Sequence, residues 1–110
     1  MTLFLSLSLL AGVTLSPPEP VSLSYYGAEY VGRTMYSGRR YNPSEPVCAS
    51  PDRPMGARLV VCHEGRCAGC VVADRMITGP YLDASSAVFE RLAPLSRGRI
   101  AAQVSSVTLP

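Results

Sequence analysis

The sequence contains no lysine and no tryptophan, and His63 is its single histidine among 110 residues. All ten basic residues are arginines, they are scattered along the chain, and the formal net charge is only +2. Nucleic-acid binding requires a concentrated basic surface. The sequence has no such cluster, and we therefore expect no nucleic-acid partner.

The sequence also lacks an apolar run of comfortable membrane-spanning length. Its longest apolar stretch, residues 3–15, ends just before the proline-rich segment that starts at Pro17. This arrangement is typical of a secretory signal peptide, although a positively charged start and a clear A-x-A cleavage motif are missing. An uncleaved short anchor and a buried first helix remain alternatives. We expect residues 1–16 to be a signal peptide or short N-terminal hydrophobic segment, 17–22 a proline-rich tether, and 23–110 the folded domain.

Cysteine is scarce, with four in the chain: Cys48, Cys62, Cys67 and Cys70. In a small exported domain, two disulfides are the expected arrangement, because an oxidising compartment preserves them and a small core benefits from them. Four cysteines allow three pairings. The run RLVVCHEGRCAGCVVAD predicts a β-hairpin whose turn is centred on Glu64 and Gly65. This register places Cys62 opposite Cys67, which makes that bridge feasible and leaves Cys48 for Cys70.

Other segments predict a mainly β fold with one short helix late in the chain. VSLSYYG, residues 21–27, reads as a strand, residues 32–46 as mostly loop, and residues 99–109 as a final strand. ASSAVFERLA predicts a helix with Asp83 or Ser85 as its N-terminal cap. We expect one domain, and we expect it to be a monomer.

The chain offers few residues for metal or nucleophilic chemistry. Cys67 and Cys70 are three apart in a predicted strand and so point to opposite faces, which argues against a zinc site. We expect no metal and no cofactor. His63 lies next to the predicted turn with no nucleophile nearby in sequence. We expect it to face solvent, and Ser-His catalysis has no support.

Tyrosine and aspartate supply the remaining candidates. Six tyrosines without tryptophan hint at a sugar-facing groove, since aromatic faces stack on sugar rings, although about half of them should serve ordinary packing. Asp74 ends an apolar strand beside Arg75. Partial burial there would favour a general acid, and a solvated Asp-Arg pair is the alternative.

An ordered set of motifs spans most of residues 22–110. The set comprises SYYG at 24–27, GRTMYSG at 32–38, CASPDRPMGARLVV at 48–61, VVADR at 71–75 and LDAS at 82–85. Together these motifs resemble the RlpA-like double-psi β-barrel domain, which is similar in fold to expansins and barwin-like proteins. The resemblance implies a six-stranded double-psi β-barrel with a sugar-binding groove, in an exported protein. Bacterial members include lytic transglycosylases that cleave peptidoglycan.

The resemblance also implies a set of site residues. Asp74 matches the family's catalytic aspartate, whereas Ser50 stands where a histidine is expected and Arg39 where a glutamate is expected. Met76 follows Arg75 in place of the expected Gly-Pro. Ser50 could orient the sugar by its hydroxyl, and Arg39 could pair with Asp74 and keep it ionised.

Two functions follow from the resemblance as expectations. The first is an enzyme, secreted or held in the periplasm or cell envelope, that cleaves peptidoglycan with Asp74 as acid and base. The second is a non-catalytic module that binds a cell-wall polysaccharide in the same groove, as expansins suggest. In either case the expected sugar-contacting residues, including the stacking tyrosines, are Tyr25, Tyr26, Arg39, Tyr41 and Arg75, with Asp83 as a second acidic or helix-capping residue. A protein-recognition role has no feature in its favour.

Overall fold

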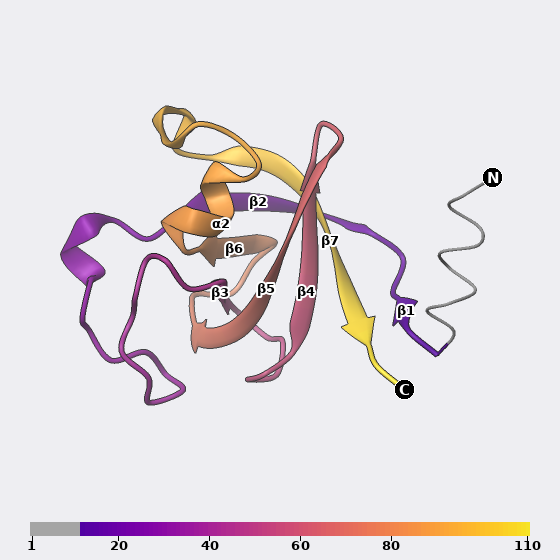
Figure 1. Ribbon diagram of the computed structural model, residues 1–110, viewed down its shortest axis with the longest axis horizontal. Helices are drawn as coiled ribbons and strands as arrows, with labels where there is room; N and C mark the ends of the chain where they lie inside the picture. The colour runs from indigo at the N-terminus through magenta and orange to yellow at the C-terminus, as the bar shows by residue number, and fades with distance from the viewer. Residues whose placement is uncertain (1–11) are drawn as a thin grey trace.

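The computed structural model describes residues 12–110, which form a small β-barrel with a few short helical turns (Figure 1). In chain order the strands are β1 (Thr14–Leu15), β2 (Glu19–Tyr25), β3 (Val47–Ser50), β4 (Arg58–His63), β5 (Arg66–Arg75), β6 (Tyr81–Ala84) and β7 (Ile100–Thr108). The helical elements are the 3-10 turns η1 (Ala28–Tyr30) and η2 (Leu95–Arg97) and the α-helix α2 (Ser86–Glu90). Within the described residues, no helix is long and apolar enough to cross a membrane.

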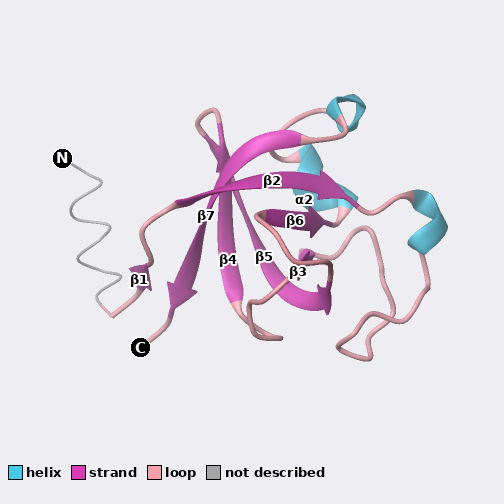
Figure 2. Ribbon diagram, turned by 180° about the vertical axis from the view of Figure 1, so that it is seen from behind, coloured by secondary structure: helices cyan, strands magenta, loops and turns pink. Residues whose placement is uncertain are grey.

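Six strands close into the barrel in the order β7-β2-β6-β3-β5-β4, and β4 pairs with β7 to complete the ring. The pairs β2–β6 and β3–β5 are parallel, and the other neighbours are antiparallel. Closure leaves no exposed sheet edge within the ring. Figure 2 shows β2, β4, β5 and β7 crossing at steep angles around the interior. The expected six-stranded barrel with one short helix is confirmed, and its mixed strand directions fit a double-psi barrel.

Alternating apolar residues fill the barrel interior. Leu23 of β2, Leu82 of β6 and Val61 of β4 are fully buried, and Phe89 of α2 packs into the same cluster. Burying side chains of this size contributes about 1.5 to 3 kcal/mol each. The short helix therefore covers one side of the barrel core with its apolar residues.

A second, smaller core lies outside the barrel, beneath the long connection between β2 and β3. Met35 and Tyr41 from this connection pack on Val47 of β3 and Ala73 of β5, with Tyr26 at the edge. Residues 31–46 contain no strand or helix, as expected, apart from one isolated bridge between Thr34 and Arg40. Apolar contacts thus hold an irregular segment against the outer wall of the barrel.

The hairpin between β4 and β5 forms as predicted. Its two-residue turn has Glu64 at φ 48° and Gly65 at φ 83°, the left-handed pair that a type I′ hairpin turn requires. Cys62 and Cys67 are direct partners in the register, with Cα atoms 4.1 Å apart, and they form a disulfide.

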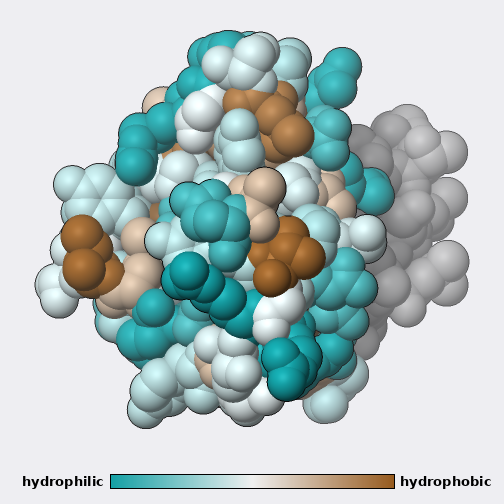
Figure 3. All heavy atoms as spheres, turned by 90° about the vertical axis from the view of Figure 1, so that its left-hand side faces the viewer, coloured by the Kyte–Doolittle hydropathy of each residue, from teal (hydrophilic) through white to brown (hydrophobic). Residues whose placement is uncertain are grey.

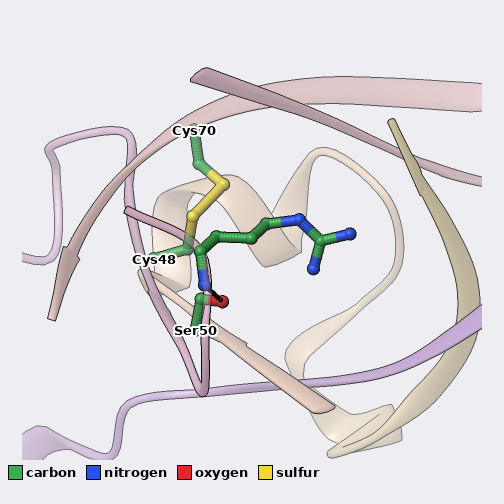
Figure 4. The surroundings of a disulfide bond; sticks show 4 residues. Cys48, Ser50 and Cys70 are labelled. Carbon is green, nitrogen blue, oxygen red and sulfur yellow. Dashed lines mark hydrogen bonds between the residues drawn. A yellow bond between two sulfur atoms is a disulfide. The ribbon is translucent and has the colours of Figure 1, made fainter. Parts of the chain in front are cut away.

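The second expected disulfide, between Cys48 of β3 and Cys70 of β5, is also present (Figure 4). Its Cα atoms are 5.9 Å apart and both cysteines lie in the barrel core. The four cysteines are therefore all paired. Two disulfides in so small a domain indicate an oxidising environment.

The N-terminal boundaries differ in part from expectation. The hydrophobic segment predicted for residues 1–16 lies mostly outside the described residues. The prediction of a tether at 17–22 was wrong from Glu19 onward, because Glu19 and Pro20 pair with Val104 and Gln103 of β7. The prolines did not prevent strand pairing here, because the sheet geometry accommodates a proline at the start of a strand.

Of the two residues expected as the helix cap, Ser85 occupies the N-cap position, without a side-chain capping bond, whereas Asp83 lies inside β6. The expectation for His63 was wrong. His63 does not face solvent: it is 8% exposed, and its Nδ1 lies 2.7 Å from the carbonyl oxygen of Ala101. Strand alternation decides this outcome, because His63 is two residues from the fully buried Val61 and so points inward.

Candidate functional site

Two carboxylates lie in one row across four neighbouring strands. Ser24 of β2 pairs with Asp83 of β6, Asp83 pairs with Ala49 of β3, and Ala49 pairs with Asp74 of β5. Direct partners in a sheet project to the same face. The buried neighbours Leu23 and Leu82 point into the barrel, so this row lies on the outer wall.

A β-bulge places Asp74 on that wall. The register between β3 and β5 shifts between Cys48 and Ala49, so that Cys48 pairs with Val72 whereas Ala49 pairs with Asp74. In a regular strand without the bulge, alternation from the inward-facing Val72 would turn Asp74, two residues later, into the barrel interior. The bulge is thus the local feature that keeps this charge out of the apolar core.

Asp74 is surrounded by hydrogen-bond donors. Its Oδ2 accepts from the Tyr26 hydroxyl at 2.5 Å, and its Oδ1 accepts from the backbone N–H groups of Tyr36 at 2.8 Å and Arg75 at 2.9 Å. The side chain is half-buried. Both carboxylate oxygens are therefore engaged by hydrogen bonds within the protein. These bonds also make Asp74 the anchor of the 26–36 segment.

Tyr26 connects the two carboxylates electrostatically. Burial, followed by the hydrogen bond to Asp74, raises the pKa of the Tyr26 hydroxyl well above its ordinary value, and the charge of Asp83 adds to the effect. The Tyr26 ring packs against Tyr41 with centroids 4.7 Å apart and against Tyr30 at 5.6 Å. Tyr26 therefore stays a neutral donor throughout the physiological range.

Asp83 has a more open environment than Asp74. It accepts a hydrogen bond from the Ser24 hydroxyl, and both side chains line a groove of about 950 Å³. Other parts of the groove come from β2, η1, the β5–β6 connection and the residue just before β7. Its lining comprises Ser22, Ser24, Tyr25, Gly27, Glu29, Tyr30, Met76, Ile77, Tyr81, Asp83 and Arg99. Asp74 is not among them.

Aromatic and charged side chains alternate around the groove. Tyr30 is 43% exposed and Tyr81 is 36% exposed. The Arg33 guanidinium lies 5.2 Å from the Tyr30 ring centre, and the Arg99 guanidinium lies 5.8 Å from that of Tyr81. These cation-π contacts restrict the tyrosine rings on one side. The groove thus combines ring faces with two carboxylates, Glu29 and Asp83, and one arginine.

Ser50 does not reach this groove. It is fully buried, and its hydroxyl accepts from the N–H of Arg53 at 3.0 Å and more weakly from that of Asp52 at 3.4 Å. The hydroxyl organises the turn after β3. The expectation that Ser50 orients a bound sugar is therefore corrected, because the turn encloses its hydroxyl.

Arg39 and Arg75 also have partners other than those expected. Arg39 forms an exposed ion pair with Glu45 at 2.8 Å, so the expected pairing with Asp74 does not occur. Arg75 donates through Nη1 to the carbonyl oxygens of Arg53 at 2.6 Å and Ser50 at 3.1 Å. Both arginines fasten loops, and neither lines the groove.

The expected tyrosines divide between packing and groove. Tyr41 is buried, and its hydroxyl accepts from the N–H of Ser86 at 3.3 Å. Tyr25 lines the groove but also packs on Phe89 at 4.8 Å and donates to the carbonyl oxygen of Leu95 at 2.8 Å. Tyr41, Tyr26 and most of Tyr25 therefore serve the framework.

Comparison with known proteins assigns the chain to a family. No family model matches the chain. The uncharacterized protein ssl3177 of Synechocystis sp. is 31% identical over 86 residues, a match that covers 76% of this chain and 93% of that protein. The chain belongs to the ssl3177 family.

A solved structure shares the fold of this ssl3177-family protein. The Streptomyces papain inhibitor (SPI) superposes with a TM-score of 0.69 and 22% sequence identity, covering 86% of this chain and 96% of that one. At this identity the likeness shows the barrel fold alone.

Sequence reasoning missed four of the six aromatic and charged groove residues of the ssl3177-family chain: Glu29, Tyr30, Tyr81 and Arg99. Each lies at the boundary of a secondary-structure element, in η1, at the start of β6 or just before β7. The available signal was positional, because Tyr81 immediately precedes the LDAS motif and Arg99 is the first residue of the expected final strand. Their closeness depends on the β2–β6 and β2–β7 pairings, which a sequence does not display.

Proposed function

We propose that this protein is an exported, RlpA-like barrel that binds a cell-wall polysaccharide, with peptidoglycan glycan as the leading ligand. The observation that carries this proposal is the groove of about 950 Å³ with Tyr30 and Tyr81 at its surface and Asp83 on its wall. Aromatic rings stack on the apolar faces of sugars, and nearby polar groups fix the orientation of hydroxyls. The disulfides and the apolar leader-like segment support export.

The charges of the groove define what kind of glycan would suit it. Asp83 and Glu29 can accept hydrogen bonds from sugar hydroxyl and acetamido N–H groups, and Arg99 can donate to carboxyl groups such as those of peptidoglycan stems. Arg99 also donates to the hydroxyl of Ser22 at 3.0 Å, which fixes its position at the groove wall. A neutral or mildly acidic glycan fits this mixture better than a strongly anionic one.

Lytic transglycosylase-like cleavage is the second candidate, because Asp74 matches the catalytic aspartate of the RlpA-like domains that the sequence resembles. A cleaving enzyme needs a carboxyl group that can donate a proton to the glycosidic oxygen. Three hydrogen-bond donors from the protein already occupy the Asp74 carboxylate, and Asp74 lies outside the groove lining. Binding without cleavage is therefore better supported.

The test is incubation of the purified, oxidised protein with denuded peptidoglycan strands, followed by sedimentation and by mass analysis for anhydro-muropeptides. We expect co-sedimentation that Tyr81→Ala weakens at least about fivefold, since stacking on an aromatic ring contributes on the order of 1 kcal/mol. Tyr36→Ala is the matched control, because Tyr36 is 71% exposed and lies outside the groove.

Each outcome of this test decides between functions. Anhydro-muropeptides that disappear with Asp74→Asn would establish cleavage instead of binding alone. Neither sedimentation nor product would reject both glycan functions. Because the neighbour's name describes a papain inhibitor, a parallel papain assay would then show whether the barrel binds a protease.

A further inference from the structure

The two disulfides lie on opposite faces of the barrel wall. Cys48 and Cys70 are 2% and 4% exposed and belong to the interior core. Cys67 is exposed and Cys62 is half-buried, and both project from the outer face of the β4–β5 hairpin. A reducing thiol can therefore reach one bond from solvent, whereas the other is shielded by packed side chains.

The surroundings of Cys67 leave its sulfur uncovered on one side. The next residue on the same face of β5 is Gly69, which is exposed and has no side chain to lie over the bond. On the other side, a hollow of about 600 Å³ borders Cys62 and includes Gln103, its register partner on β7. Both flanks of the bond thus offer room for an approaching molecule.

The hairpin does not depend on the Cys62–Cys67 bond for its shape. The residues on either side, Val61 with Ala68 and His63 with Arg66, are paired in the same register, and β4 is also paired along β7. The bond spans a sequence separation of only 5, against 22 for Cys48–Cys70. A short loop gives a disulfide the smaller stabilising effect, so the barrel should survive its reduction.

We propose that Cys62–Cys67 is a thiol–disulfide exchange site for a protein dithiol, while Cys48–Cys70 stays oxidised. A reductant thiolate attacks Sγ of Cys67, the S–S bond breaks, and Sγ of Cys62 leaves as a thiolate that takes up a proton. The second reductant thiol, once deprotonated, attacks the reductant sulfur of the mixed disulfide and releases Cys67. Two electrons and two protons pass to this protein, and the dithiol becomes a disulfide.

The experiment is graded reduction of the folded protein with dithiothreitol, and in a second arm with a thioredoxin-type dithiol, followed by alkylation and peptide mapping. We expect Cys62 and Cys67 to be alkylated at least about tenfold faster than Cys48 and Cys70, since access controls exchange. Far-ultraviolet circular dichroism should stay native during this fast phase. Simultaneous labelling of all four cysteines, or no labelling before the dichroism signal is lost, would overturn the proposal.

A matched variant tests the role of access directly. A Cβ at Gly69 would meet only the carbonyl oxygen of Leu59 at 3.7 Å, an ordinary contact, so Gly69→Val should keep the fold. Its side chain would lie beside Cys67 on the same face of β5. We expect labelling of Cys67 to slow several-fold with unchanged melting temperature. Unchanged labelling in a folded Gly69→Val protein would show that the open flank has no role and would overturn that part of the proposal.

Discussion

Asp74 and Asp83 lie in the same row of the barrel wall, yet their surroundings differ. Asp74 accepts three hydrogen bonds and holds the 26–36 segment. Asp83 accepts a single side-chain hydrogen bond, from Ser24, and lines the groove. The resemblance to RlpA-like domains points to Asp74, whereas Asp83 is the carboxylate of the two that lines the groove. One carboxylate thus lies within a hydrogen-bond network and the other at an open surface.

The largest expected effect is that of Asp74→Ala on stability. The substitution leaves the Tyr26 hydroxyl and two backbone N–H groups without their acceptor, and we expect a loss of about 2 to 4 kcal/mol in the free energy of unfolding. Urea denaturation followed by circular dichroism measures it. Asp83→Ala, the matched control, should cost about 1 kcal/mol or less. Equal costs for the two variants would remove the distinction between these carboxylates.

The next effect concerns glycan binding, where we expect the substitution at Asp83 to matter more than the one at Asp74. Asp83→Asn keeps the shape of the side chain but removes the charge from the groove, so we expect affinity for peptidoglycan strands to fall about fivefold to tenfold. Asp74→Asn should leave affinity within about twofold, because Asp74 lies outside the lining. Sedimentation isotherms check both values. A larger loss of affinity with Asp74→Asn than with Asp83→Asn would show that the glycan binds at Asp74, the residue that the resemblance indicates.

The variant Tyr26→Phe tests the hydrogen bond from Tyr26 to Asp74 through the pH dependence of stability. The folded state holds the Tyr26 pKa above its unfolded value, so the folded chain keeps this proton while the unfolded chain releases it above about pH 10. Stability from Tyr26 is therefore complete below pH 10 and is lost as the pH rises further, by at most about 1.4 kcal/mol per pH unit.

Denaturation curves from pH 7 to pH 11 for the wild type and Tyr26→Phe test this sign. We expect the variant to be about 1 kcal/mol less stable at pH 7 and the gap to narrow above pH 10. A gap that widens with alkaline pH would contradict the assignment of Tyr26 as the proton donor to Asp74.

The smallest effect is expected for Arg39→Ala. Arg39 pairs with Glu45 on the surface, and exposed ion pairs of this kind contribute about 0 to 1 kcal/mol. We expect a change below about 0.5 kcal/mol in urea denaturation. A loss comparable to that of Asp74→Ala would instead support the pairing of Arg39 with Asp74 that the resemblance suggested.

Local patterns predicted the parts of the fold that depend on neighbouring residues. The Glu64-Gly65 turn fixes the hairpin register, and the register brings Cys62 opposite Cys67. The final strand and the short helix follow from periodicity in the same way. Predictions that depended on which face a residue occupies were less successful. His63 and Ser50 are buried, because strand alternation and a tight turn enclose them.

The exposed face near the long connection illustrates the same limit. Figure 3 shows apolar side chains there as separate spots among polar ones, so composition alone marks no binding surface. Exposed Tyr36 and buried Met35 and Tyr41 belong to the same connection and lie on different sides of it. The packing against Val47 and Ala73 decides that side, and the packing arises only when the barrel has formed.

The sequence alone determined the hairpin and the late helix, because turn geometry and residue periodicity act over short stretches. The expected barrel class came from the resemblance carried by motifs spread over residues 22–110, and the disulfide pairing that the hairpin register makes feasible is the one observed. Only the tertiary structure determined which residues come together at the groove. The bulge at Ala73 turned Asp74 outward, and the β2–β6 pairing brought Asp83 beside Ser24. The groove joins residues more than 70 positions apart, from Ser22 to Arg99. Such closeness comes from closing the barrel, a long-range event that no local pattern encodes.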